Sequence, residues 1–259
     1  MIKKIGMPLL LTLIIISLGY SLIYYPFIKS NNYYVIISDK EIFKVHNNKW
    51  SKISNRNINR LSFGNSYSIN NNRFIGKTYL NSSKDNLEIY DNTYQKISVS
   101  DTLITINTNK KIEDIKIASF FDSIDDVDMN NVNNILKRYS LENEMFNLNL
   151  KYIADLNNDG NDDIIYSISN FYDTEDKSKA FSIIFSCIND NLEVIDEVIV
   201  DKADELNSKS LYLKNISDID IDDKYELIVA NTSYGNDNVC YSIYRYDTSS
   251  NNFVKLIEC

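Results

Sequence analysis

The stretch Asp155–Asp163 constrains this chain most, because it places oxygen-bearing side chains at alternate positions around a single glycine and then enters an apolar run. A calcium ion takes about six to eight oxygen ligands, and a tight turn supplies them when alternate side chains point inward. Gly160 lets the chain turn where a Cβ atom would collide. The pattern therefore predicts a calcium loop. Its candidate ligands are Asp155, Asn157, Asp159, the backbone carbonyl of Asn161, and Asp163.

A second copy of the pattern lies at residues 218–226, which is 63 positions further on (218 minus 155). The flanking apolar residues match as well, so the copies define two units over residues 151–199 and 214–258. A repeat of this length is typical of propellers and solenoids. For each loop the alternative is an acidic, solvated β-turn. The second set of candidate ligands is Asp218, Asp220, Asp222, Lys224 in the place of Asn161, and Glu226.

The spacing excludes an EF-hand, whose loop has a glutamate at its twelfth position and a helix on either side. The twelfth positions here are Tyr166 and Val229, which lie in strand-like runs. Both loops instead close at the ninth position and lead into a strand.

A loop that closes in this way resembles the calcium loops of the FG-GAP or VCBS repeats of integrin-α-type β-propellers, whose signature is D-x-[DN]-x-D-G-x-x-[DE] before an apolar strand. The resemblance covers residues 150–259. The second loop departs from it, because Asp223 stands in place of the glycine. The resemblance implies a propeller fold, structural calcium in the first loop and in the second if that loop is occupied, and ligand recognition through loops on one rim.

The N-terminal segment is expected to cross a membrane. Lys3 and Lys4 precede residues 5–28, which carry no charged side chain. At about 1.5 Å per residue this run spans a bilayer core of about 30 Å. The basic end favours a cytoplasmic N-terminus. A cleaved signal peptide is the alternative, although its apolar core is usually about 7–15 residues long. We therefore expect residues 1–29 to be a cytoplasmic stub and signal anchor, with residues 30–259 outside the cell.

The charge of the remaining chain excludes nucleic acid as a partner. The first 29 residues hold three lysines and no acidic residue. Residues 30–259 therefore carry 24 basic residues (27 minus 3) and 36 acidic ones, a net charge of −12. Such a surface repels phosphate backbones and anionic lipids, and it attracts cations.

Three cysteines are too few for a disulfide scaffold, but two are placed to pair. In a hairpin centred on Ser249-Ser250, the numbers of opposed residues add to 499, and Cys240 and Cys259 satisfy that condition. Directly opposed residues bring their Cβ atoms to about 4.5–5.5 Å, which is near disulfide range. Cys187 lies in an apolar run and is expected to be a buried free thiol.

Short alternating runs with polar turns predict an all-β domain from residue 30 onward. A first group of strands is expected at 33–37, 41–45 and 50–53, and a second at 73–80, 87–90, 94–99 and 103–107. Residues 126–141 are expected to form a helical insertion, and the acidic residues before it to complement the helix dipole or, alternatively, to form a third metal loop. The expected fold is a propeller-like array of about four to five small antiparallel sheets. The apolar helical face is Met129, Val132, Ile135, Leu136 and Tyr139.

No catalytic motif is found. His46, the single histidine, lies at the edge of an asparagine-rich turn, and G-x-S-x-G, H-E-x-x-H and phosphate-binding glycine motifs are absent from the sequence. We therefore expect a non-enzymatic, membrane-anchored extracellular binding or adhesion module with a protein or glycan ligand. Two alternatives stay open: an extracytoplasmic sensing or assembly subunit of a membrane complex, and a glycan-active hydrolase that uses paired carboxylates.

Overall fold

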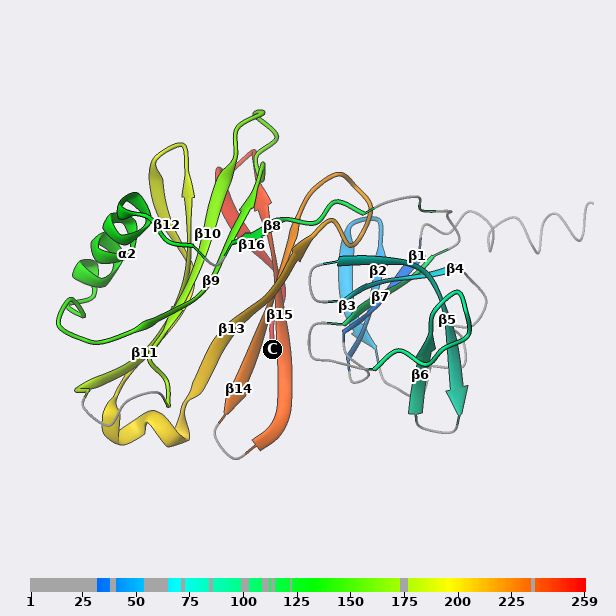
Figure 1. Cartoon of the computed structure of the whole chain (residues 1–259), viewed down its shortest axis with the longest axis horizontal. Coiled ribbons are helices and arrows are strands. Elements are labelled where there is room, and N and C mark those ends of the chain that lie inside the picture. Colours follow the sequence, from blue (N-terminus) through cyan, green and yellow to red (C-terminus); the bar gives the residue numbers. More distant parts are fainter. Residues whose placement is uncertain are drawn as a thin grey trace, which may run out of the picture.

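A computed structural model describes residues 32–37, 41–53, 65–70, 73–83, 86–98, 103–108, 112, 115–121, 123–172, 177–233 and 236–259. These residues form three antiparallel sheets, one short α-helix and a 3-10 helix (Figure 1). The predicted membrane segment lies outside the described residues. Within them, no helix combines the length and the apolar character needed to cross a bilayer.

The first sheet has seven strands in the order β3-β2-β1-β7-β4-β5-β6 and curls into a half-barrel (Figure 1). β7 lies between β1 and β4 and pairs with both, so it joins two groups of strands that we expected to form separate sheets. The described residues therefore form fewer and larger sheets than expected. The strands are β1 Asn32–Ile37, β2 Glu41–His46, β3 Lys49–Ile53, β4 Asn65–Asn70, β5 Arg73–Ser83, β6 Asn86–Tyr90 and β7 Ile104–Thr108.

The structure differs from the prediction at two places in this sheet, although residues 96 and 97 do pair with β6, through a bridge between Lys96 and Tyr90 and a hydrogen bond from the N–H of Ile97 to the carbonyl of Ile89 at 2.8 Å. The strand expected at residues 94–99 begins in a turn instead, where Asp91 accepts hydrogen bonds from the backbone of Thr93 and Gln95 at 2.8 and 2.9 Å. Tyr94 has a φ of 62°, which a strand does not allow. β4 was missed because its sequence is polar. Its Ser68 is buried and hydrogen-bonds the hydroxyls of residues 78 and 105 in the neighbouring strands.

The two expected repeat units fall on two meanders. A five-stranded sheet has the order β12-β11-β10-β9-β8, and a four-stranded sheet has the order β13-β14-β15-β16. The 3-10 helix η2, Lys202–Asn207, joins them. The strands are β8 Ser119–Phe121, β9 Asn147–Ala154, β10 Asp163–Ser169, β11 Lys179–Ile188, β12 Asn191–Asp201, β13 Lys209–Ser217, β14 Glu226–Ser233, β15 Asn236–Asp247 and β16 Asn252–Ile257.

The sheets are stacked in layers, with the four-stranded sheet in the middle (Figure 1). In β14, Leu227 and Val229 pack against the five-stranded sheet, whereas Ile228 and Ala230 pack against the seven-stranded one. Burial on both faces explains why β14 reads as a continuous apolar run. This stack replaces the radiating blades that the family resemblance implied, and no propeller is found among the described residues.

The helix α2, Asp126–Arg138, covers the outer face of the five-stranded sheet (Figure 1). Asp125 caps its first turn and forms a capping box with Asp128. Asp126 and Asp128 lie in that turn, where acidic residues were expected to complement the helix dipole. Asp122, the other acid of that prediction, lies outside the described residues.

Val132, Ile135 and Leu136 of the predicted apolar face are buried, and Tyr139 packs against their cluster. At the start of the helix the prediction differs, because Met129 is exposed and Asp128 is buried. The helix also ends before residues 139–141, which were expected to continue it.

The hairpin of β15 and β16 has the predicted register near its turn, where Tyr246 pairs with Phe253 and Asp247 with Asn252. Cys240 and Cys259 are joined by a disulfide, with their Cα atoms 5.4 Å apart, as predicted. Cys187 is free and half-buried.

Replacing both disulfide cysteines by serine is expected to lower the free energy of unfolding by about 3 kcal/mol, because the bond closes a loop with a sequence separation of 19. Urea unfolding of the parent and the double variant measures this difference. A reducing agent should lower the free energy of unfolding of the parent by the same amount and leave that of the variant unchanged. Equal stability of the two proteins under oxidising conditions would contradict the prediction.

Candidate metal centre

The two acidic loops connect equivalent strands of the two meanders. Residues 155–162 link β9 to β10, and residues 218–225 link β13 to β14. The strands enter and leave both loops in the same register, since Asp163 pairs with Ala154 and Glu226 pairs with Ser217. The sequence repeat is therefore also a repeat of backbone geometry.

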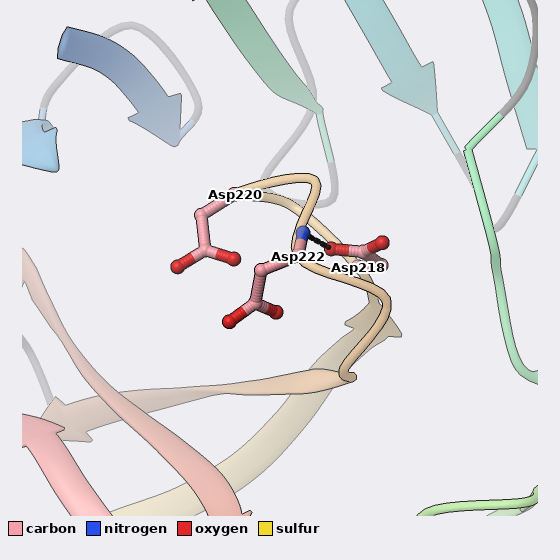
Figure 2. A group of neighbouring side chains, drawn as sticks. All are labelled: Asp218, Asp220 and Asp222. Atoms are coloured by element: carbon pink, nitrogen blue, oxygen red, sulfur yellow. Dashed lines mark hydrogen bonds between the residues drawn. The ribbon is translucent and has the colours of Figure 1, made fainter. Parts of the chain in front are cut away.

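The first aspartate of each loop organises the turn in the same way. One oxygen of Asp155 accepts a hydrogen bond from a backbone N–H four residues ahead, and the other accepts one from the next residue. Asp218 repeats both bonds, one of which is drawn in Figure 2. The donors are Asp159 and Gly160 in the first loop and Asp222 and Asp223 in the second, all at 3.0 Å.

The closing acid of each loop is also tied to the backbone. Asp163 accepts a hydrogen bond from the N–H of Leu156 at 2.9 Å, and Glu226 accepts one from the N–H of Ile219 at the same distance. A carboxylate oxygen has two lone pairs, so it keeps one for another ligand. These predicted metal ligands therefore shape their loops and retain the capacity to bind a cation.

Each loop has two residues in the left-handed region, and they fall at matching positions. Gly160 has a φ of 87°, and Asp223 in its place has a φ of 68°, so the departure from the family signature keeps the conformation. Asn158, at 58°, is matched by Ile221 at 61°. A β-branched residue in this region is an outlier. Ile221 packs against the apolar cluster between the seven-stranded and four-stranded sheets.

The second loop gathers a group of carboxylates. Asp218, Asp220 and Asp222 each offer an oxygen within 4.8 Å of the others, a spacing that can hold a metal ion. In the view of Figure 2, Asp220 and Asp222 lie on one side of the loop and Asp218 on the other. In the first loop Asn157 takes the place of Asp220, so an amide replaces the middle carboxylate.

Arg245 of β15, which sequence reasoning missed, enters the second loop. Its guanidinium donates to Glu226 at 2.5 Å, to Asp222 at 3.0 Å and to Asp220. Arg245 is 7% exposed, and Asp220 and Glu226 are also buried. A signal was present in the sequence, because Arg245 is the only charged residue in the strand run 241–246.

The electrostatics of the second loop are those of a buried ionic cluster. Burial raises the pKa of Asp220 and of Glu226, and the Arg245 guanidinium opposes both rises. Burial alone would lower the pKa of Arg245, but the carboxylates around it raise that pKa above its usual value. A cation is therefore already present among the carboxylates of this loop. Lys224, the remaining predicted ligand, donates its backbone N–H to Asp222 at 3.1 Å.

Among the described residues, no basic side chain occupies the first loop in the way that Arg245 occupies the second. Burial raises the pKa of Asp163, and the neighbouring Asp159 and Asp155 raise it further. Within the described residues, no ion pair involves these three aspartates. Asp159 instead accepts from the side-chain amides of Asn157 and Asn189 at 2.8 and 3.1 Å, and from the Asn161 backbone N–H at 2.8 Å.

The loops also differ in exposure. Residues 158–162 of the first loop are exposed, whereas most of the second loop is buried or half-buried. Leu156 of the first loop and Tyr225 of the second belong to one apolar cluster, so both loops lie at the same end of the stacked sheets. The first loop is therefore the more accessible to an ion from solution.

No known family model, curated protein or solved structure matches the chain. The resemblance to the FG-GAP and VCBS repeats thus rests on the residues of the two loops.

Proposed function

We propose that this chain is a membrane-anchored extracellular binding or adhesion module, and that a structural calcium ion at the first loop stabilises its β-sheet stack. Asp155, Asn157, Asp159, the Asn161 carbonyl and Asp163 would hold the ion. These are oxygen ligands, which calcium prefers. The bound ion would neutralise the negative charge of the three aspartates.

The observation that carries the proposal is the contrast between the loops. They share a backbone geometry, yet Arg245 pairs with three carboxylates of the second loop, while those of the first have no basic partner among the described residues. Asp163, which closes the first loop, is buried, and removing a carboxylate from water is costly unless a cation accompanies it. The donor set of the first loop is oxygen only and partly open to solvent, which fits a calcium ion.

Calcium is expected to stabilise the full chain, purified in detergent. A ligand that binds the folded state alone adds about 1.4 kcal/mol at a tenfold excess over Kd and about 2.7 kcal/mol at a hundredfold excess. For a domain of this size the midpoint of thermal unfolding should rise by roughly 3–10 °C. Thermal scans at 10 mM calcium and in chelator measure the rise.

The matched pair of variants for this experiment is Asp159→Asn and Asp162→Asn. Both remove one exposed negative charge, but only Asp159 belongs to the proposed ligand set. We expect Asp159→Asn to abolish the calcium-dependent rise and Asp162→Asn to retain it. A parent midpoint that is independent of calcium would refute the proposed calcium site.

The extracellular placement has separate support. A disulfide persists in oxidising compartments, and Cys240 and Cys259 form one.

A further inference from the structure

Arg245 occupies the centre of the second loop, where the family resemblance implies a metal ion. It contacts three of the predicted ligands at once, namely Asp220, Asp222 and Glu226. We propose that Arg245 takes the place of the metal ion in this loop, so that the loop folds without metal. Replacing Arg245 by the residue found at the matched position of the first unit should then convert the loop into a calcium site.

The matched position is identified by strand register. In the second unit Arg245 lies opposite Glu226, the acid that closes the loop. In the first unit the register of β10 and β11, continued by one residue, brings Ile188 opposite Asp163. Ile188 is buried in the apolar cluster between the sheets, so it contributes no charge to the first loop. The second loop also has Lys116, which pairs with Asp223 at 3.2 Å, but both of these side chains are exposed. Among the buried positions opposite the closing acid, the two units therefore differ by Arg245 in one and Ile188 in the other.

The guanidinium suits this role because of its shape. It presents five N–H donors in a rigid fork and stays ionised in proteins. Arg245 uses Nε and both terminal nitrogens on the three carboxylates. A calcium ion placed beside it would be repelled, and at short range in a buried site this repulsion is large. Arg245 and a metal ion therefore exclude each other from this loop.

One atom of the loop shows unused capacity for a ligand. Oδ1 of Asp220 is buried and has no hydrogen-bond partner, although the other oxygen of the same carboxylate binds Arg245. Buried carboxylate oxygens are nearly always hydrogen-bonded. With Arg245 removed, Asp220 would offer both oxygens, and the group of three aspartates would have the ligand spacing of a metal site.

The test is the number of calcium ions bound by the full chain, measured by equilibrium dialysis. The first loop is disabled by Asp159→Asn, so the result does not depend on the proposed site there. In this background we expect no bound calcium with Arg245 present. With Arg245→Ile added we expect one ion per chain, with a Kd of about 10⁻⁴–10⁻³ M, and we expect Asp220→Ala to remove it.

Arg245→Gln is the second variant, because it keeps much of the side-chain length and loses the charge. Folding is followed by circular dichroism with and without 10 mM calcium. A variant that folds only with calcium supports the proposal, since the metal then replaces the lost guanidinium. Calcium bound at Asp220 while Arg245 is present overturns the proposal. So does the failure of both variants to bind calcium or to fold in its presence. Absence of calcium from the parent alone would instead count against the first loop.

Discussion

Asp128→Ala is expected to lower the free energy of unfolding by about 3–5 kcal/mol, which is the usual cost of removing one partner of a buried ion pair. The Asp128 carboxylate accepts from the ammonium of Lys151 at 2.6 Å and from the hydroxyl of Tyr166 at 2.7 Å. Both charged side chains are almost wholly buried. The variant also breaks the capping box of α2, because Asp128 accepts the backbone N–H of Asp125.

The matched control is Asp126→Ala, which removes an exposed acid from the same helical turn. Its expected cost is below about 1 kcal/mol. A double variant, Asp128→Leu with Lys151→Met, should recover much of the loss because no charge is left buried. Urea unfolding of the four proteins gives the comparison. Equal effects of Asp128→Ala and Asp126→Ala would contradict our account.

The titration of Asp128 makes the difference in unfolding free energy between the parent and Asp128→Ala depend on pH. Burial raises the pKa of Asp128, but Lys151, the Asp125 backbone N–H and Tyr166 together lower it below its usual 3.8. Its stabilising contribution is therefore complete above about pH 4 and is lost as the pH falls through the lower pKa of the folded state. The stability difference between parent and Asp128→Ala should narrow below pH 4.

Phe185→Ala is expected to cost about 3–5 kcal/mol, the range for truncating a buried phenylalanine. Phe185 is wholly buried in the layer between α2 and the five-stranded sheet, where its ring stacks on Tyr166 with centroids 4.8 Å apart. Truncation removes this stacking and leaves a cavity that the flanking strands cannot close.

Phe121→Ala is the control for this variant, because Phe121 lies on the edge strand β8 and is 43% exposed. It should change stability by less than about 1 kcal/mol. Thermal unfolding separates the two variants. If Phe121→Ala lowered the stability as much as Phe185→Ala, Phe121 of β8 would have to contribute to the core, and the prediction would be wrong.

The loops could be predicted from sequence because their information is local. Alternate oxygen-bearing residues, a sixth residue that accepts positive φ (Gly160 or Asp223) and the apolar exit specify each turn within nine residues. The structure places the paired hydrogen bonds at the same positions in both loops. The turn of the β15–β16 hairpin also led to the disulfide, which the structure contains. The pairing shifts by one residue between Ile243 and Tyr244, however, so the register at the turn does not extend unchanged to the cysteines. Whether the predicted ligands bind calcium stays a prediction.

The assembly of the sheets could not be predicted, because it depends on pairs that are distant in sequence. Nothing in the sequence of β7 shows that it lies between β1 and β4. Arg245 posed the same difficulty, because it meets its loop partners only after β14 and β15 pair. The burial of the Asp128 side chain likewise depends on its ion pair with Lys151, which lies on β9.

The central position of the four-stranded sheet has a consequence for the order of folding. Residues 209–257 come after both neighbouring sheets in the chain, yet they supply the surface against which each neighbour buries an apolar face. The earlier sheets therefore emerge during synthesis with these faces uncovered, and contacts of long sequence separation must form last. A chain that stops before β13 loses the middle of its core, so we expect completion of the C-terminal meander to commit the whole β-sheet stack to its folded state.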